Sequence, residues 1–232
     1  MTRLEIIPVE GLPEVQPGDR LAPLLTACVD LLDGDVVVVT QKVVSKAEGR
    51  VVAVDPDDPA AYAAAIEAEC VRVLRRRGDL VIAETAAGFV CANAGVDRSN
   101  VPDGYVTLLP LDADRSARRI RDGLRASAGV AVGVIVSDTF GRPWRQGVTD
   151  VAIGCAGIAA VVDLRGTADA LGRTLEVTEV AVADELAGAA ELVMGKSAGV
   201  AAAVVRGVDR AWFRDASVRA EIVRPPAEDL FR

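Results

Sequence analysis

Four consecutive valines at positions 36–39 place the strongest constraint on the fold of this 232-residue chain. β-Branched residues favour strands, and an unbroken apolar run has no polar side to turn to solvent, so a strand buried on both faces is expected. Such a strand needs packing elements above and below its sheet. Because 51% of the residues are hydrophobic but only 3% are aromatic, Val, Ala, Leu and Ile must supply that packing. The composition therefore favours helices packed over an interior sheet.

Around this strand, helix and strand patterns alternate without the regular spacing of βαβ units, which predicts a mixed α/β sheet rather than a doubly wound one. The clearest helix pattern covers residues 55–78, with Pro59 near its start and Arg75–Arg77 and Gly78 at its end. Residues 40–50 are expected to be a polar segment, and residues 151–166 fit either a helix or a strand. Further strands are expected at 4–13, 80–85, 88–96, 130–139 and late in 195–207, and further helices at 21–32 (closed by Gly34), 112–128 and from near residue 180.

Charge and composition exclude several classes of protein. The net charge is −8, so a nucleic-acid binder, which needs an excess of Lys and Arg, is not expected. No apolar run approaches the roughly 18–20 residues that cross a bilayer, and the N-terminus lacks a signal-peptide core, so we expect a cytoplasmic protein without membrane contact. The four cysteines are far apart in apolar surroundings, which favours reduced core thiols.

The complete absence of histidine narrows the chemistry further. Neither a Ser-His-Asp triad, nor a Cys-His pair, nor a His-ligated zinc can form. Any metal ion would bind to oxygen ligands, which favours Mg²⁺ or Mn²⁺ over Zn²⁺. An anionic substrate would also need nearby basic residues or a metal ion to overcome the negative field of the whole chain.

Two carboxylates follow predicted strands. Strand 130–139 ends at Ser137-Asp138-Thr139, after which the chain is expected to turn through residues 141–145, and Asp97 follows strand 88–96. Asp is common in such turns because it makes local hydrogen bonds, so each residue alone fits a structural role. Together with the Thr139 hydroxyl, they fit equally well a Mg²⁺ or Mn²⁺ site that substrate phosphates and water complete.

Basic residues outside the predicted helix faces could meet those phosphates, although each could equally be a solvated loop residue. They are Lys42, Lys46, Arg142 and Arg145. The arginines within 75–77 and 115–125 are expected to be ordinary exposed helix charges. The chain has neither a GxxxxGK[ST] loop nor a GxGxxG motif after a strand, and GKSAG at 195–199 has the wrong order and spacing.

Several segments together resemble one family over essentially the whole chain. They are VEGLPEVQPGD, VVVTQKVVSKAEGR, CANAGVDRSNV, GVIVSDTFGRPWRQGV, LEVTEVAVADELA and LVMGKSAG. These segments look like the coenzyme F-420-0:L-glutamate ligases, the gamma-glutamyl ligases of deazaflavin biosynthesis. The resemblance implies an α/β fold distinctive of the family and an intertwined homodimer. It also implies a reaction in which GTP drives the joining of L-glutamate to the lactyl carboxylate of F-420-0 and the extension of a gamma-linked tail, releasing GDP and phosphate.

The resemblance also implies a set of site residues. One or two Mg²⁺ or Mn²⁺ ions are implied, with K⁺ as a candidate further ion. The implied metal ligands are Asp97, Asp138 and Thr139. The implied GTP contacts are Leu12, Pro13, Glu14, Val15, Gln41, Lys42, Lys46, Asn100 and the loop of Gly195, Lys196 and Ser197.

The chain departs from the archaeal pattern at two places. Archaeal members carry small hydroxyl residues where Gln41 and Lys42 stand, and an acidic or amide side chain near Lys196 and Ser197, so the resemblance leaves the third metal ligand open. The loop is more similar to that of actinobacterial enzymes, whose ligase part precedes a nitroreductase-like flavin domain. We expect a single ligase domain over residues 1–232, with residues 224–232 as a tail or linker.

A carboxylate is a poor acyl donor, and phosphorylation by GTP would convert it into an acyl phosphate with a good leaving group. We expect the two aspartates and Thr139 to hold the ions against the nucleotide, Lys42 and Lys46 to pair with phosphate oxygens, and Arg142 and Arg145 to orient the acidic acceptor. The residues expected to be catalytic are Asp97, Asp138, Lys46 and Arg142. The alternatives are a non-catalytic nucleotide- or deazaflavin-binding module and a metal-dependent phosphatase that uses Asp138.

Overall fold

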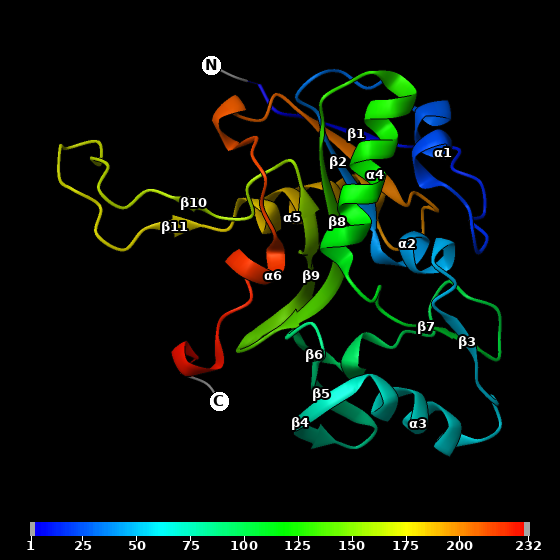
Figure 1. The fold of residues 1–232 in the computed structure, drawn as a ribbon. Helices are drawn as coiled ribbons and strands as arrows, with labels where there is room; N and C mark the ends of the chain where they lie inside the picture. The colour runs from blue at the N-terminus through cyan, green and yellow to red at the C-terminus, as the bar shows by residue number, and fades with distance from the viewer. Residues whose placement is uncertain (1–2, 230–232) are drawn as a thin grey trace.

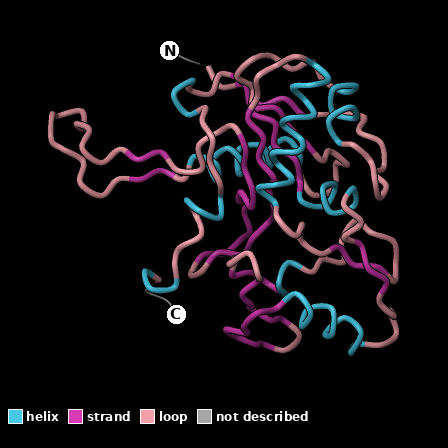
Figure 2. Tube along the Cα trace, viewed as in Figure 1, coloured by secondary structure: helices cyan, strands magenta, loops and turns pink. Residues whose placement is uncertain are grey.

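The computed structural model describes residues 3–229. Its centre is a five-stranded sheet with helices on both faces (Figures 1 and 2). The strand order is β1-β12-β2-β8-β9, and only β2 and β8 run parallel. The predicted mixed sheet is thus confirmed. Its strands are β1 (Glu5–Pro8), β2 (Val36–Thr40), β8 (Gly133–Arg142), β9 (Arg145–Ala156) and β12 (Ala202–Arg206).

The valine strand lies at the centre of this sheet and separates two cores. Val36 to Val39 are each 0% exposed; Val37 and Val39 face one core, and Val36 and Val38 face the other. Helices α1 (Leu21–Cys28), α2 (Gln41–Ala47) and α4 (Ala113–Ala128) cover the first face. Helices α5 (Val182–Met194) and α6 (Val218–Glu221) cover the second. The predicted helix over 112–128 is confirmed, with Asp112 as its N-cap and Gly129 in a left-handed conformation at its end.

A smaller unit with its own core lies below the sheet in Figure 1. It contains a β3–β7 pair and a three-stranded sheet, and the predicted strands 80–85 and 88–96 are its adjacent strands β5 and β6. The elements are β3 (Val51–Ala53), α3 (Pro59–Glu69), β4 (Cys70–Arg77), β5 (Leu80–Thr85), β6 (Val90–Ala92), the 3-10 turn η1 (Asn93–Gly95) and β7 (Tyr105–Thr107).

Two predicted helices are shorter than their sequence patterns. The prediction for 55–78 is wrong beyond Glu69, because residues 70–77 form β4 and pair antiparallel with β5. Gly78, at φ 57°, therefore makes the turn between these strands, and the arginines before it lie on a strand. The helix of 21–32 ends at Cys28, and Gly34 lies in the turn before β2. The segment expected to be merely polar, 40–50, forms α2.

The strand that carries Asp138 is also longer than expected. It continues to Arg142 and turns at Pro143-Trp144 into β9, so the predicted turn over 141–145 is a β-hairpin. Residues 151–166, which fitted either structure, are strand as far as Ala156. Residues 162–180 form an arm that projects from the body in Figure 1, with the short strands β10 (Val162–Asp163) and β11 (Glu179–Val180) at its base.

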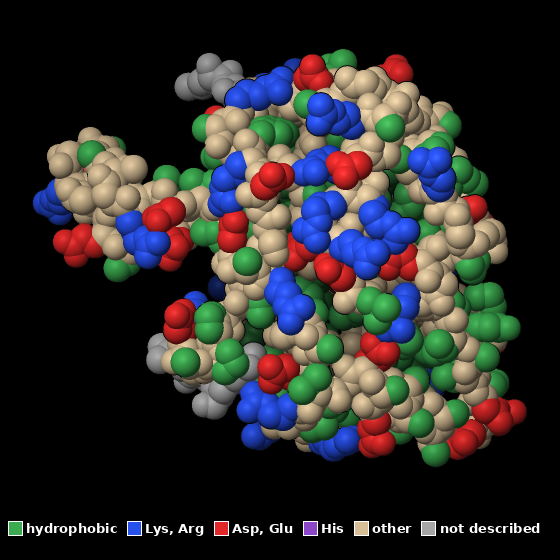
Figure 3. All heavy atoms as spheres, viewed as in Figure 1, with side chains coloured by type: hydrophobic (Ala, Val, Ile, Leu, Met, Phe, Trp, Pro, Cys, Tyr) green, Lys and Arg blue, Asp and Glu red, His purple; other side chains and the backbone are tan. Residues whose placement is uncertain are grey.

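Three further features concern the cysteines, membrane spans and surface charge. All four cysteines are free. None of the helices in residues 3–229 has the length and apolar character that a membrane span requires. Basic side chains, interspersed with acidic ones, gather over α4 on the face shown in Figure 3. After α6 comes the short turn η3 (Pro226–Glu228), and residues 230–232 of the predicted tail lie outside the described residues, as do residues 1 and 2.

Candidate functional site

The junction between β2 and α2 brings Gln41 and Lys42 to the end of the central strand. Gln41 is 1% exposed, and its side-chain amide donates to Ser45 Oγ at 2.7 Å and to the Leu108 carbonyl at 2.9 Å. Its side chain therefore holds α2 against the segment after β7 instead of facing solvent. Lys42, the next residue, points away from the core and reaches the loop that follows η1.

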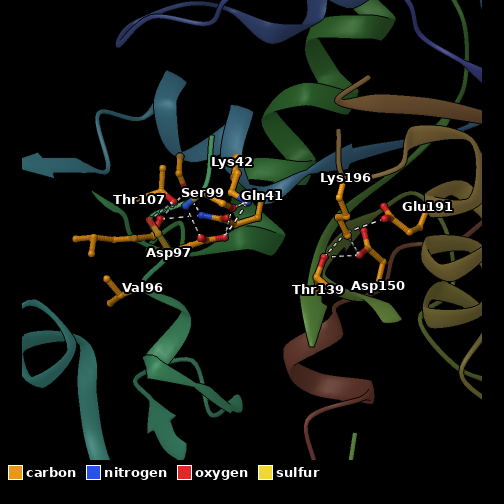
Figure 4. Close-up of polar contacts among 12 residues, drawn as sticks. Gln41, Lys42, Val96, Asp97, Ser99, Thr107, Thr139, Asp150, Glu191 and Lys196 are labelled. Carbon is orange, nitrogen blue, oxygen red and sulfur yellow. Dashed lines mark hydrogen bonds and ion pairs between the residues drawn. The ribbon is translucent and has the colours of Figure 1, made fainter. Parts of the chain in front are cut away.

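Lys42 and Asp97 form the first half of the candidate site (Figure 4). The Lys42 ammonium lies 2.7 Å from Asp97 Oδ2 and donates to Ser99 Oγ at 2.6 Å. The backbone of Asp97 is bonded in both directions to Thr107, which fixes its position. Burial alone would raise the pKa of Asp97, but hydrogen bonds from Lys42 and Ser99 outweigh it and lower the pKa below its usual value. The lowered pKa means that Asp97 is charged at neutral pH.

Asp138 joins this half of the site from β8. It lies between Val136 and Phe140, which both pack into the core beneath α2 and α4, so its side chain projects from that face of the sheet. Burial raises the pKa of Asp138 to about 7; the Thr139 N–H and Lys42 oppose the rise, while the charges of Asp97 and Asp150 add to it. The fold thus brings Asp97 and Asp138 within electrostatic range of each other, although 41 positions separate them in the chain.

Thr139 projects from the opposite face of β8, toward α5. Its hydroxyl donates to Asp150 Oδ1 at 2.6 Å and also contacts the Lys196 ammonium. That ammonium lies 2.9 Å from Asp150 and 2.8 Å from Glu191. Figure 4 shows these four residues as a group separate from Asp97 and Lys42. Of the three implied metal ligands, Asp138 and Thr139 therefore project from opposite faces of β8, and Asp97, from the loop after η1, lies on the Asp138 side.

The other implied GTP contacts lie around this centre. The Lys46 ammonium pairs with Glu14 at 2.6 Å, which joins α2 to the loop of residues 12–15. In that loop Val15 is buried and Leu12 packs on the core, while Pro13 and Glu14 are exposed. Asn100 is exposed with a positive φ of 57°, and Gly195, Lys196 and Ser197 form an exposed loop after α5.

Arg142 and Arg145, predicted to orient the acceptor, lie at the exposed tip of the β8–β9 hairpin. Arg142 is four residues beyond Asp138, roughly 13 Å along an extended strand. Its guanidinium donates to the Gln146 carbonyl within the hairpin. The structure does not bring these two arginines to the aspartates, and their contact with a substrate stays a prediction.

Sequence reasoning missed Asp150 and Glu191, which contact Lys196. Asp150 is 2% exposed and accepts hydrogen bonds from Ser137 and Thr139, because the hairpin register sets it opposite Thr139. The position opposite Thr139 depends on the register of the β8–β9 hairpin, which the sequence pattern does not specify. Glu191 lies one helical turn before the end of α5, and an (i, i+4) spacing to the loop at 195 was its only sequence signal.

The carboxylates of Asp97 and Asp138 fit a hard divalent cation whose remaining coordination positions are filled by substrate and water. Among residues 3–229, no three His, Cys, Asp or Glu side chains converge into a complete protein metal centre. Mg²⁺ commonly takes one or two carboxylates and fills its shell with phosphates and water, and Asp97 with Asp138 supplies such a pair. A groove of about 920 Å³ between α1, α2 and α4 contains neither aspartate, and acidic and basic residues line it in similar numbers.

The raised pKa of Asp138 predicts how pH affects the stability of the metal-free protein. The folded chain retains this proton up to about pH 7, whereas the unfolded chain releases it near 3.8. Because the folded state binds more protons between these values, the contribution of Asp138 to the free energy of unfolding should fall as pH rises through them. Urea denaturation with EDTA at about pH 5 and about pH 7.5 should show Asp138→Asn gaining stability over the parent chain as pH rises. If the stability difference between Asp138→Asn and the parent chain were the same at both pH values, this assignment would be contradicted.

Comparison with known proteins identifies the family of this chain. A profile of the family described as F420-0:Gamma-glutamyl ligase matches residues 11–207. The chain is 43% identical over 247 residues to a protein of Methanopyrus kandleri named Coenzyme F420:L-glutamate ligase, covering 99% of this chain and 97% of that one. Relatives of the same name in Methanothermobacter thermautotrophicus and Archaeoglobus fulgidus are each 42% identical, covering 99% of this chain and 99% and 97% of theirs. The chain therefore belongs to the F420-0:gamma-glutamyl ligase family and is an enzyme of the ligase class.

Proposed function

We propose that this protein joins L-glutamate to F-420-0 at the expense of GTP and extends a gamma-linked glutamate tail. The names of its relatives support the two substrates. The observation that carries the proposal is the pair of carboxylates, Asp97 and Asp138, which come from distant parts of the chain to one face of β8 beside Lys42. The charge of Asp97 raises the pKa of Asp138, so a cation or a charged substrate complex beside them would favour the state in which both carboxylates are ionised.

The reaction proceeds in two displacements. The acceptor carboxylate attacks the γ-phosphorus of GTP, the bond to the bridging oxygen breaks, and GDP leaves. The glutamate amine then attacks the acyl carbon, the carbon–oxygen bond to phosphate breaks, and phosphate leaves with the amine proton going to water or a phosphate oxygen. Splitting the reaction in this way replaces oxide with phosphate as leaving group.

Charge neutralisation and positioning are the protein's tasks in both steps. A divalent ion held by Asp97 and Asp138 would neutralise charge on the transferred phosphoryl group. Lys42 pairs with Asp97 and Lys46 with Glu14, and in the proposed reaction each lysine gives up its ion pair to meet a phosphate oxygen. The Lys46 partner, Glu14, has a side chain that is 71% exposed, so this pair is of the weak exposed kind and exchanges at little cost.

A homodimer is part of the proposal. The arm of residues 162–180 extends from the body of the chain in Figures 1 and 2, and its tip carries the exposed apolar residue Leu171. An apolar side chain on a projecting arm favours contact with a second copy. Sedimentation of the full chain would measure the assembly directly.

One assay tests the proposed reaction against its alternatives. The protein is incubated with GTP, Mn²⁺, F-420-0 and L-glutamate, and products are followed by chromatography and mass spectrometry. The expected result is GDP together with a mass gain of one glutamyl unit on the acceptor. GDP without the amide would favour a phosphatase, and nucleotide binding without either product would favour a binding module.

A further inference from the structure

The ammonium of Lys196 is held by oxygens from three different elements. It contacts Thr139 Oγ1 on β8, Asp150 Oδ1 on β9 at 2.9 Å, and Glu191 Oε1 on α5 at 2.8 Å. Figure 4 shows the three side chains pointing toward the lysine. Two carboxylates and a hydroxyl that converge in this way make the kind of oxygen cage that a hard cation prefers.

The cage requires a positive charge. Asp150 is 2% exposed, and the Glu191 side chain is 19% exposed. Glu191 Oε2 is buried and has no hydrogen-bond partner among the described residues. Without Lys196, two largely buried carboxylates would lie near each other with no positive charge to compensate them, which is unfavourable. The unpartnered Oε2 belongs to the same carboxylate that contacts the ammonium through Oε1.

The residue type matches this role. The chain has three lysines against 23 arginines, and the three are Lys42, Lys46 and Lys196, all at the candidate site. A lysine ammonium is a compact point charge that can sit among converging oxygens as an ion does, whereas the planar guanidinium of arginine is suited to a flat, two-oxygen partner. The Lys196 side chain is 54% exposed, so a bound nucleotide could approach it from solvent.

We propose that Lys196 acts as a built-in second cation of the nucleotide site. This role rests on the proposed function, and it lowers the expected number of divalent ions at the site from one or two to one. A single divalent ion binds on the Asp97 and Asp138 face of β8, and the ammonium of Lys196 supplies the second positive charge from the Thr139 face. Lys196 meets the nucleotide phosphates directly, while Asp150 and Glu191 position it.

The stoichiometry of bound Mn²⁺ tests this assignment independently of turnover. Free Mn²⁺ is titrated by electron paramagnetic resonance against the full chain saturated with a non-hydrolysable GTP analogue. The wild type should bind one ion per chain. Lys196→Gln and Lys196→Ala, which vacate the cage, should each bind two. As a matched control, Arg165→Gln removes a cation that also lies between two carboxylates, Asp163 and Glu179, but on the arm, and should leave the count at one.

Turnover supplies a second readout. Loss of the ammonium should lower kcat by about 100-fold at low Mn²⁺, the usual scale for removing one charge-stabilising group. Added Mn²⁺ should restore much of the rate by entering the vacated cage, and the dependence of rate on Mn²⁺ should become steeper. A lysine that merely anchors the loop after α5 would produce neither the second ion nor the recovery.

Three results would overturn the inference. Two ions bound to the wild type would do so without any variant. A count that stays at one in folded Lys196→Gln and Lys196→Ala, checked by thermal melting, would do so as well. No bound ion in the wild type would reject the carboxylate site along with it, and the product assay would then show whether the ligase activity itself survives.

Discussion

Replacing Asp138 with asparagine is expected to lower kcat for glutamyl transfer by about 1,000-fold while leaving the chain folded, since loss of a preorganised charged group at a reacting centre has this scale. Asparagine keeps the shape of the side chain and removes the charge that is proposed to bind the ion. Burial raises the pKa of Asp138, which means that the charge is unfavourable to the fold itself. The melting temperature of the metal-free variant should therefore be equal to or higher than that of the parent near neutral pH.

The measurement combines product formation with Mn²⁺ binding. GDP and the glutamyl adduct are quantified under single-turnover conditions, and the resonance titration should show loss of the bound ion. Asp97→Ala should behave in the same way, because it removes the other carboxylate. Asp163→Asn serves as the matched control: Asp163 is an exposed carboxylate paired with Arg165 on the arm, and activity should be retained. Near-normal turnover in either site variant would refute the metal assignment.

Replacing Asp114 with alanine is expected to destabilise the protein by about 3–5 kcal/mol, the cost of removing one member of a buried, charge-assisted network. Asp114 is 6% exposed and lies in the first turn of α4. Its carboxylate accepts hydrogen bonds from the backbone N–H of three residues and from one hydroxyl, at 2.7 to 3.2 Å. These donors are Cys155 N, Val218 N, Arg219 N and Ser217 Oγ.

The reason for so large an effect is that one side chain joins three segments, α4, β9 and the start of α6. Removal would leave buried donors without partners, which costs more than the hydrogen bonds contributed. Asp112→Ala is the matched control on the same helix: Asp112 is exposed and caps α4 through the Arg115 N–H, so its loss should cost about 1 kcal/mol. Urea denaturation of both variants measures the difference, and equal losses would contradict the clamp described for Asp114.

Much of the central fold could be predicted because local pattern and tertiary environment agree there. The valine run, the amphipathic pattern over 112–128 and the paired strands at 80–85 and 88–96 each have a period that matches their surroundings. Residues 70–77 show the opposite case. Their charges and the preceding alanine-rich segment favour a continued helix, but pairing with β5 across the Gly78 turn decides the structure. Local propensity is weak beside such pairing.

For the candidate site, the sequence supplied candidate residues but not their spatial arrangement. The absence of histidine and the wide spacing of the four cysteines favoured oxygen ligands for any metal, and Asp97 and Asp138 were selected at predicted strand ends for that reason. Nothing local to Gln41 indicated that its side chain is consumed by contacts to Ser45 and Leu108. The hydrogen bond to Leu108 spans 67 positions of the chain, a separation that no periodicity can report.

By itself, the sequence determined that a sheet covered on both faces would form, that no histidine could take part in the chemistry, and which family the chain resembles. Tertiary structure alone decided which groups meet. Adjacent residues of a strand point to opposite faces, so Asp138 joins Asp97 and Lys42 while Thr139 joins Lys196. The register of the β8–β9 hairpin then sets Asp150 opposite Thr139. Such pairings depend on contacts between distant segments, and these exist only after the chain has folded.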